Sequence, residues 1–154
     1  MLNKDYKEML QCLLEEKVKF LLVGAYAVAV HGYPRATKDI DFFVWATPKN
    51  ASNLMKALIK FGAPLDQISE ADFASKGIVF QIGNSPRRID IITSASGVDF
   101  EQAYLNKQIV LLEGLEVPVM SLQDLIVNKR ASGRTQDLAD VEKLTSTQKV
   151  RSDK

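Results

Sequence analysis

Two aspartates one residue apart stand at the start of an apolar run, in the segment that reads LLVGAYAVAVHGYPRATKDIDFFV from Leu21 to Val44. Residues 39–45 have the composition of a strand, and side chains in a strand alternate between its faces, so Asp39 and Asp41 project the same way. Like charges about 6–7 Å apart repel unless a cation or a proton lies between them. A divalent metal ion is the simplest partner for such a pair.

A third acid stands in a similar setting. Asp90 lies in the strand-like run of residues 88–92, where it alternates with isoleucines. Magnesium prefers oxygen ligands, takes one or two protein carboxylates, and completes its shell with water and substrate phosphate. Three acids would allow two metal ions roughly 3.5–4 Å apart, an arrangement suited to phosphoryl transfer. Asp39, Asp41 and Asp90 are therefore the candidate catalytic residues and the candidate ligands of Mg²⁺ or Mn²⁺. Taken alone, an acid at a strand edge could instead pair with a nearby base.

The elements that must position these acids follow from hydrophobic periodicity and turn signals. Apolar residues at helical spacing predict an amphipathic helix over residues 3–17 and a small-residue helix over 25–30, and Gly24 ends the short buried strand that separates them. The Thr47-Pro48 pair starts a third helix that ends near Gly62. The predicted strands of this half are residues 20–23 and 39–45.

The second half of the chain predicts two hairpins followed by two helices. Residues 63–75 are weakly patterned and indicate an irregular connection with a short helical turn. The predicted hairpins pair residues 78–82 with 88–92 and 109–112 with 115–120, and the predicted helices are 121–131, capped by Ser121, and 135–144. The fold class is α+β: a small mixed or antiparallel sheet flanked by helices. We expect one domain over residues 1–144 and a disordered tail over 145–154.

The bulk composition restricts the possible partners. The 154 residues are 46% hydrophobic and 25% charged, which suits one globular domain with its own core. Twenty basic residues against nineteen acidic ones leave a net charge of +1, so recognition of nucleic acid must be local. The single Cys12 predicts a buried thiol in a reducing cytoplasm. The longest apolar stretch, residues 20–31, is shorter than the about 20 residues needed to cross a bilayer, and no membrane is expected as a partner.

The order of these residues resembles the polymerase-beta-type nucleotidyltransferase superfamily: a strand ending in Val23-Gly24, a short helix, then Arg35, Thr37, Asp39 and Asp41, and a later Asp90 on its own strand. Within it, the sequence is most similar to bacterial nucleotidyltransferases of the AbiEii type, whose relatives include toxins of toxin-antitoxin pairs. The resemblance implies that the glycine turn holds the triphosphate. It also implies that the paired acids hold both metal ions, and that the third acid holds the catalytic metal ion and helps deprotonate the acceptor.

The C-terminal run NKRASGRTQDLADVEKL resembles the paired helices with which this family returns a lysine and an aspartate to the nucleotide. Lys129 would then place a compact positive charge on a phosphate. Asp137 either assists the site or caps the last helix. The resemblance gives these nucleotide-binding residues: Gly24, Ala25, Arg35, Thr37, Lys38, Lys129 and Asp137. Arg35 and Lys38 could equally belong to a solvated loop.

One departure bears on activity. Family members place a second glycine or a serine directly after the first glycine, whereas this chain has Ala25 and then Tyr26. Alanine still permits close approach to phosphate, but the hydroxyl contact is lost. The sequence predicts metal-dependent transfer of a nucleoside monophosphate from an NTP to a hydroxyl of RNA or of a small molecule, with an antitoxin as a possible partner. The alternative is a nucleotide-binding or partner-binding module of the same fold with weak or no catalysis.

Overall fold

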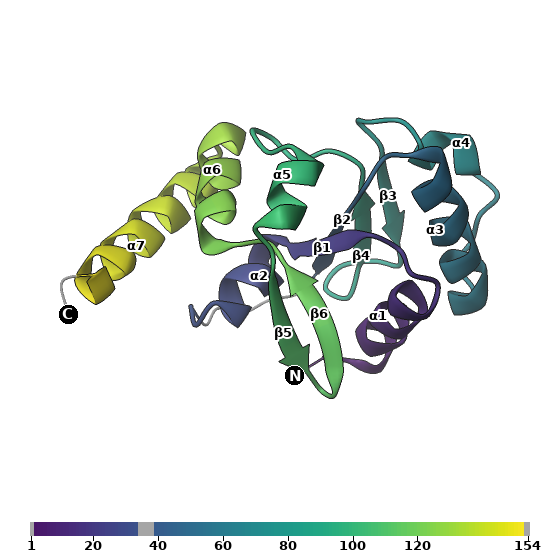
Figure 1. Ribbon diagram of the computed structural model, residues 1–154, viewed down its shortest axis with the longest axis horizontal. Coiled ribbons are helices and arrows are strands. Elements are labelled where there is room, and N and C mark those ends of the chain that lie inside the picture. The colour runs from purple at the N-terminus through teal and green to yellow at the C-terminus, as the bar shows by residue number, and fades with distance from the viewer. Residues whose placement is uncertain (1, 34–38, 153–154) are drawn as a thin grey trace.

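The computed structural model describes residues 2–33 and 39–152, and the side chains of residues 147–152 are not described. In this part of the chain, seven helices surround one six-stranded sheet of order β3-β4-β2-β1-β6-β5 (Figure 1). The strands are β1 (Phe20–Val23), β2 (Ile40–Val44), β3 (Val79–Ile82), β4 (Ile89–Ile92), β5 (Gln108–Leu112) and β6 (Leu115–Val119). The helices are α1 (Lys4–Glu15), α2 (Gly24–Val30), α3 (Pro48–Phe61), α4 (Glu70–Phe73), α5 (Phe100–Leu105), α6 (Leu122–Ser132) and α7 (Thr135–Ser152).

The sheet is mixed. β1 runs antiparallel to β2, and each of these central strands has a parallel neighbour on its other side, β6 for β1 and β4 for β2. The predicted hairpins β3–β4 and β5–β6 are both antiparallel and form the two edges. In Figure 1, α1, α3 and α4 gather on one side of the sheet, and α6 and α7 lie on the opposite side. The predicted α+β class, with a mixed sheet flanked by helices and two helices at the C-terminus, is confirmed.

The register of the central strands brings the chemistry-bearing residues to one end of the sheet. Val23, the last residue of β1, lies opposite Asp41 on β2, and Asp41 lies beside Asp90 on β4. At the other end of the same strands, Phe20 lies opposite Val44. The glycine turn that follows β1 therefore emerges next to the acids.

The helices begin and end where local chemistry allows. Thr47 caps α3 by accepting a hydrogen bond from the backbone N–H of Asn50, Pro48 occupies its first turn, and Gly62 ends it with a φ of 89°. Ser121 caps α6 by accepting from the N–H of Asp124. All four signals are visible in the sequence, and these helices lie within one residue of their predicted bounds.

The hydrophobic core is built on the two central strands. β1 is fully buried, and Phe20 and Phe42 of the neighbouring strands meet edge to face at 5.6 Å between ring centroids. α1 presents Met9, Leu10 and Leu13 to this core, as its periodicity predicts. No helix in the described ranges is both long enough and apolar enough to cross a lipid bilayer.

Three elements differ from the sequence-based expectation. α5 is not predicted, although Asp99 caps it by accepting from the N–H of Gln102. β2 begins at Ile40, so Asp39 immediately precedes the strand. The last helix, expected to end near Leu144, continues to Ser152, because residues 145–152 contain neither the glycine nor the proline that would stop it. The expected short turn in residues 63–75 is confirmed as α4.

Candidate functional site

Asp41 and Asp90 occupy neighbouring positions on the parallel strands β2 and β4. Residues in register on adjacent strands project to the same face of a sheet, so the two carboxyl groups lie side by side. Burial raises the pKa of Asp41 to about 7 from its usual value of 3.8, and the charge of Asp90, a hydrogen bond with it and the charge of Asp39 add to the rise. Arg88 opposes it. The carboxyl group of Asp41 therefore holds its proton to a higher pH than an exposed aspartate does.

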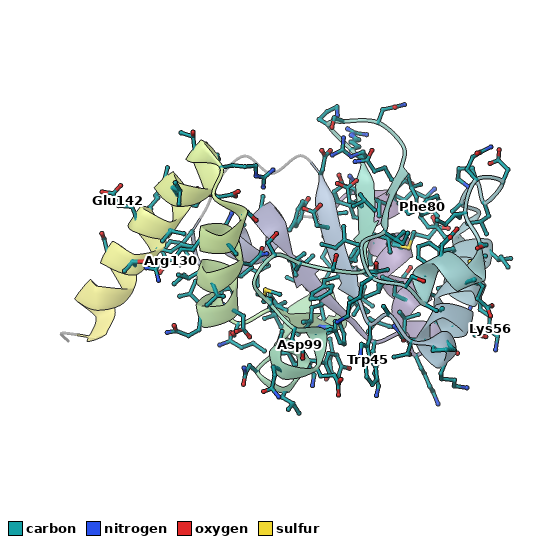
Figure 2. The ribbon with its side chains drawn as sticks, turned by 90° about the horizontal axis from the view of Figure 1, so that it is seen from above. Trp45, Lys56, Phe80, Asp99, Arg130 and Glu142 are labelled. Atoms are coloured by element: carbon teal, nitrogen blue, oxygen red, sulfur yellow. The ribbon has the colours of Figure 1, made fainter. Side chains whose placement is uncertain are left out.

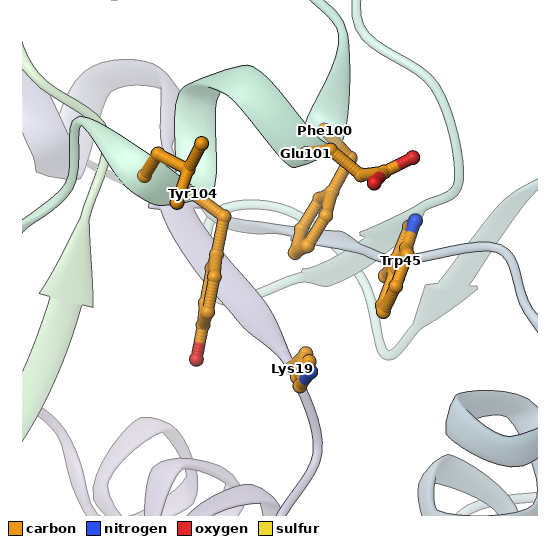
Figure 3. A pocket seen from close by; sticks show the side chains of 6 residues that line it. Lys19, Trp45, Phe100, Glu101 and Tyr104 are labelled. Atoms are coloured by element: carbon orange, nitrogen blue, oxygen red, sulfur yellow. The ribbon is translucent and has the colours of Figure 1, made fainter.

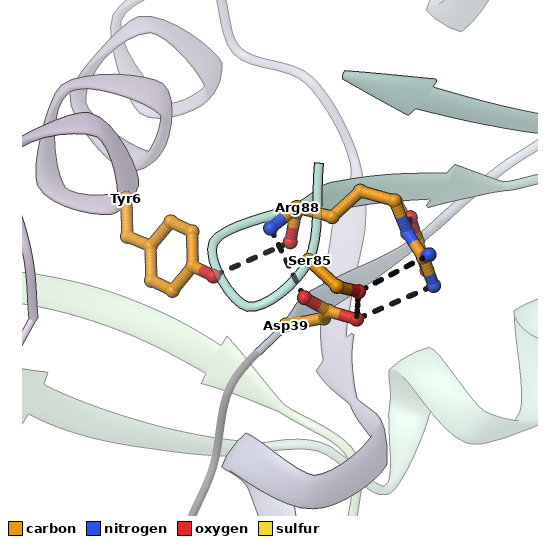
Figure 4. A network of polar contacts seen from close by, with 5 residues as sticks. Tyr6, Asp39, Ser85 and Arg88 are labelled. Carbon is orange, nitrogen blue, oxygen red and sulfur yellow. Dashed lines mark hydrogen bonds and ion pairs between the residues drawn. The ribbon is translucent and has the colours of Figure 1, made fainter. Parts of the chain in front are cut away.

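Asp39 is held by the β3–β4 connection rather than by its own strand (Figure 4). Its Oδ1 atom accepts from the backbone N–H of Arg88 at 3.0 Å, and its Oδ2 atom accepts from the Ser85 hydroxyl at 2.8 Å. The Arg88 guanidinium adds an ion pair to the same Oδ2 atom at 3.3 Å. These contacts fix the carboxylate of Asp39 at the edge where β2 begins.

The Arg88 guanidinium also binds Asp90. Its Nε atom donates to Oδ1 at 2.7 Å and its Nη2 atom donates to Oδ2 at 3.2 Å, which makes the pair bidentate. Arg88 thus bridges Asp39 and Asp90.

At the end of β1, Gly24 lets the side chain of Asp41 lie against the backbone. Its φ of 69° lies in the left-handed region that disfavours other residues, and a Cβ atom placed there would overlap the Asp41 carboxylate, with Cγ at 3.1 Å. The Asp41 carboxylate lies in the space that a side chain at position 24 would need.

A cavity of about 310 Å³ opens between this turn and the C-terminal helices. From the sheet side it is lined by Gly24, Ala25 and Asp41, and from α6, α7 and the connection between them by Lys129, Arg134, Gln136, Asp137 and Asp140. The structure thus brings together five of the predicted site residues: Gly24, Ala25, Asp41, Lys129 and Asp137. Gln136 is a lining residue that the sequence analysis missed, because a lone glutamine on a helix carries no recognisable signal.

The α6–α7 side of the cavity carries an ionic network around the buried side chains of Lys129 and Asp137. Lys129, only 7% exposed, places its Nζ atom 3.0 Å from an oxygen of Asp140 and 3.7 Å from an oxygen of Asp137. Arg134 donates to both oxygens of Asp137, at 2.6 and 3.2 Å. The ammonium group of Lys129 is therefore already paired with carboxylates.

The carboxyl oxygens of Asp39, Asp41 and Asp90 are the kind of ligand that a hard divalent cation prefers. A cation would also stabilise the ionised form of Asp41, whose pKa is raised by burial and by the neighbouring carboxylates. Within residues 2–33 and 39–152, no three acidic, histidine or cysteine side chains are grouped closely enough to hold a metal ion. The guanidinium of Arg88 binds two of the three acids instead. Predicted residues Arg35, Thr37 and Lys38 lie outside the described residues.

A second cavity, of about 190 Å³, lies at the opposite end of β1 and β2 (Figure 3). Trp45 stacks on Phe100 with ring centroids 6.0 Å apart, Phe100 stacks on Tyr104 at 5.3 Å, and Lys19 lies over the Trp45 ring. In Figure 2, Arg130 and Glu142 mark the α6–α7 end of the molecule, and Trp45 lies well away from them. Trp45 therefore packs in an aromatic cluster remote from the acids.

The structure places a glycine turn after a buried strand, an acid directly before and an acid within the next strand, and a third acid on a parallel neighbour, the order in which the sequence resembles nucleotidyltransferases. A family model described as "Nucleotidyltransferase of unknown function (DUF6036)" matches residues 1–153, and the chain belongs to this family. Its members are enzymes of nucleotidyl transfer. No curated protein sequence matches the chain.

Solved structures share the fold. A candidate nucleotidyltransferase of Thermotoga maritima is 17% identical with a TM-score of 0.60, covering 100% of this chain and 97% of its own. The lincosamide antibiotic adenylyltransferase LnuA, solved with lincomycin bound, is 14% identical with a TM-score of 0.59, over 95% of this chain and 98% of that one. The antibiotic-resistance factor ANT(2'')-Ia is 14% identical with a TM-score of 0.62, over 93% and 82%.

Proposed function

We propose that this protein transfers a nucleoside monophosphate from a nucleoside triphosphate to an acceptor hydroxyl and releases pyrophosphate. The observation that carries the proposal is the cavity that joins the glycine turn and Asp41 to Lys129 and Asp137, directly beside the Asp41–Asp90 pair. A single catalytic domain over residues 1–144 would contain all of these groups.

In this reaction the acceptor oxygen bonds to the α-phosphorus, the bond from that phosphorus to the bridging oxygen of the β-phosphate breaks, and pyrophosphate leaves. Asp39, Asp41 and Asp90 would hold Mg²⁺ or Mn²⁺, which when bound neutralises phosphate charge and activates the attacking oxygen. Asp90 takes up the proton of the acceptor hydroxyl. The rest of catalysis is positioning and charge neutralisation.

The other site residues bind the triphosphate. Gly24 and Ala25 line the cavity and let phosphate oxygens approach the backbone closely, because glycine has no side chain and alanine has only a methyl group. Lys129 supplies a positive charge once a phosphate competes with its carboxylate partners, and Asp137 positions that lysine. Arg35, Thr37 and Lys38 stay predictions from the sequence as further triphosphate contacts.

The acceptor is a small molecule or the end of an RNA. The small-molecule class draws support from two proteins of the same fold, one solved with lincomycin bound and one named as an antibiotic-resistance factor. The finer likeness to AbiEii-type enzymes, an antitoxin partner and a cytoplasmic location remain predictions from the sequence.

One test uses the purified full chain with each labelled triphosphate, Mg²⁺ or Mn²⁺, and an extract that contains RNA and small molecules. We expect label in one acceptor fraction, its loss in Asp41→Asn, and its retention in the exposed control Asp66→Asn. Transfer that survives in Asp41→Asn with unchanged metal dependence would overturn the assignment. Triphosphate binding without transfer to any fraction would favour the alternative, a module with weak or no catalysis, for which the Ala25-Tyr26 departure is the main support.

A further inference from the structure

The guanidinium of Arg88 forms ion pairs with two of the three acids, Asp39 and Asp90, and Figure 4 shows its contact with Asp39. Its guanidinium reaches Oδ2 of Asp39 at 3.3 Å and both oxygens of Asp90 at 2.7 and 3.2 Å. The Ser85 hydroxyl lies 3.4 Å from its Nη1 atom and 2.8 Å from Asp39. One positive group therefore holds two carboxylates, one directly before β2 and one on β4.

This arrangement uses the oxygen atoms that a metal ion needs. Carboxylate lone pairs that accept hydrogen bonds from a guanidinium are directed toward it, so a metal ion that uses the same oxygens must displace the guanidinium. Arginine stays charged at any physiological pH and cannot leave by losing a proton. It can leave only by rotating, and its side chain, 30% exposed, has solvent on one side.

The backbone contacts of Arg88 would survive such a rotation. Its N–H donates to Asp39, and its carbonyl accepts from the N–H of Ile40 and from the Tyr6 hydroxyl. These three bonds hold the residue in place independently of where the side chain lies. The guanidinium can thus move without loss of the local fold.

We propose that Arg88 is a built-in competitor of the divalent cation: its guanidinium bridges Asp39 and Asp90 in the metal-free protein and swings away when the metal ion binds. Arg88 then sets the metal affinity of the site and keeps the acids in place before the metal ion arrives. The proposal rests on the proposed function, because it takes these carboxylates to be the metal ligands.

The first test is calorimetric titration of the metal-free full chain with Mn²⁺. Arg88→Gln removes the competing charge, and we expect it to bind Mn²⁺ about tenfold more tightly than the parent protein. Arg88→Lys keeps a charge but cannot bridge both carboxylates with a planar fork, so its affinity lies between the two. The exposed neighbour Arg87 is the matched control, and Arg87→Gln leaves the affinity unchanged.

The second readout is the melting temperature with chelator and with saturating Mn²⁺. We expect Arg88→Gln to melt below the parent protein in chelator and level with it in Mn²⁺, because the metal ion replaces the lost charge. A purely structural role would lower the melting temperature equally in both conditions.

The outcomes separate the two proposals. In one outcome the parent protein binds Mn²⁺, Asp41→Asn does not, and Arg88→Gln binds Mn²⁺ no more tightly than the parent. This result overturns the competition between Arg88 and the metal ion but leaves the proposed function standing. Absence of Mn²⁺ binding by the parent protein and all variants overturns both. Should Arg88→Gln fail to fold, Arg88→Lys carries the same comparison.

Discussion

Gly24 and Asp41 lie so close that a Cβ atom on Gly24 would overlap the carboxylate of Asp41. The contact arises because Val23 lies opposite Asp41 in the β1–β2 register and the chain then turns through a positive φ. The glycine therefore has two separate reasons to be there: its backbone conformation, and the space that the acid occupies.

Gly24→Ala should lose catalytic efficiency about 100-fold, because a shift of the Asp41 carboxylate by about 1 Å misplaces a group that the reaction needs. Strain from an alanine in the left-handed region adds a loss of about 1–2 kcal/mol in the free energy of unfolding. The measurements are kcat/KM for nucleotidyl transfer and urea denaturation.

Gly62→Ala is the matched control for Gly24→Ala. Gly62 also has a positive φ, of 89°, but has open space where a Cβ atom would lie. It should show a similar loss of stability with activity unchanged. Equal activity losses in the two variants would mean that strain alone, and not the contact with Asp41, explains the effect.

Local sequence signals predicted the fold class and most of the helices and strands. Alternation predicted that Asp41 and Asp90 each lie on a strand, and capping residues such as Thr47 and Ser121 marked helix starts, because both are local signals. That these two strands are neighbours is seen only in the structure. The Arg88 bridge was not predictable, since Arg88 meets Asp39 only through strand register and the β3–β4 connection. α5 was missed because only six residues form it.

The stability of the metal-free protein should fall as the pH rises from about 4 to about 7. The pKa of Asp41 is about 7 in the folded protein, raised by burial and by the charges of Asp90 and Asp39 against the opposing charge of Arg88. In this pH window the native state binds a proton that the unfolded chain has released, so the group stabilises the fold at low pH and loses that effect as it ionises. The loss is at most about 4 kcal/mol.

Asp41→Asn removes this pH dependence, because asparagine carries no charge at any pH in the window. The measurement is urea denaturation in chelator from pH 5 to pH 8, with Asp66→Asn as the exposed control. We expect the parent and the control to share one slope and Asp41→Asn to be flatter and more stable near pH 8. A parent slope of opposite sign would contradict the raised pKa.

Lys129→Met should lower the free energy of unfolding by about 3 kcal/mol. The substitution removes the countercharge that Lys129 places beside the buried carboxylates of Asp137 and Asp140. Arg130→Met, on the exposed face of the same helix, is the control and should change stability by under about 0.5 kcal/mol. Loss of activity at unchanged stability would instead show that the charge of Lys129 serves the substrate alone.

Asn50→Ala should destabilise the fold by about 3 kcal/mol without involving the acids directly. Asn50, 4% exposed on α3, accepts from the N–H of Lys19 at 2.7 Å and donates to the carbonyls of Lys19 at 3.0 Å and Trp45 at 2.9 Å. Alanine would leave these backbone groups without their side-chain partner at the junction of α3 with the ends of β1 and β2. Asn53→Ala, three residues further along α3 and partly exposed, is the control for helix propensity. Urea denaturation measures both variants, and equal losses would show that the hydrogen bonds of Asn50 contribute nothing beyond the change of residue type.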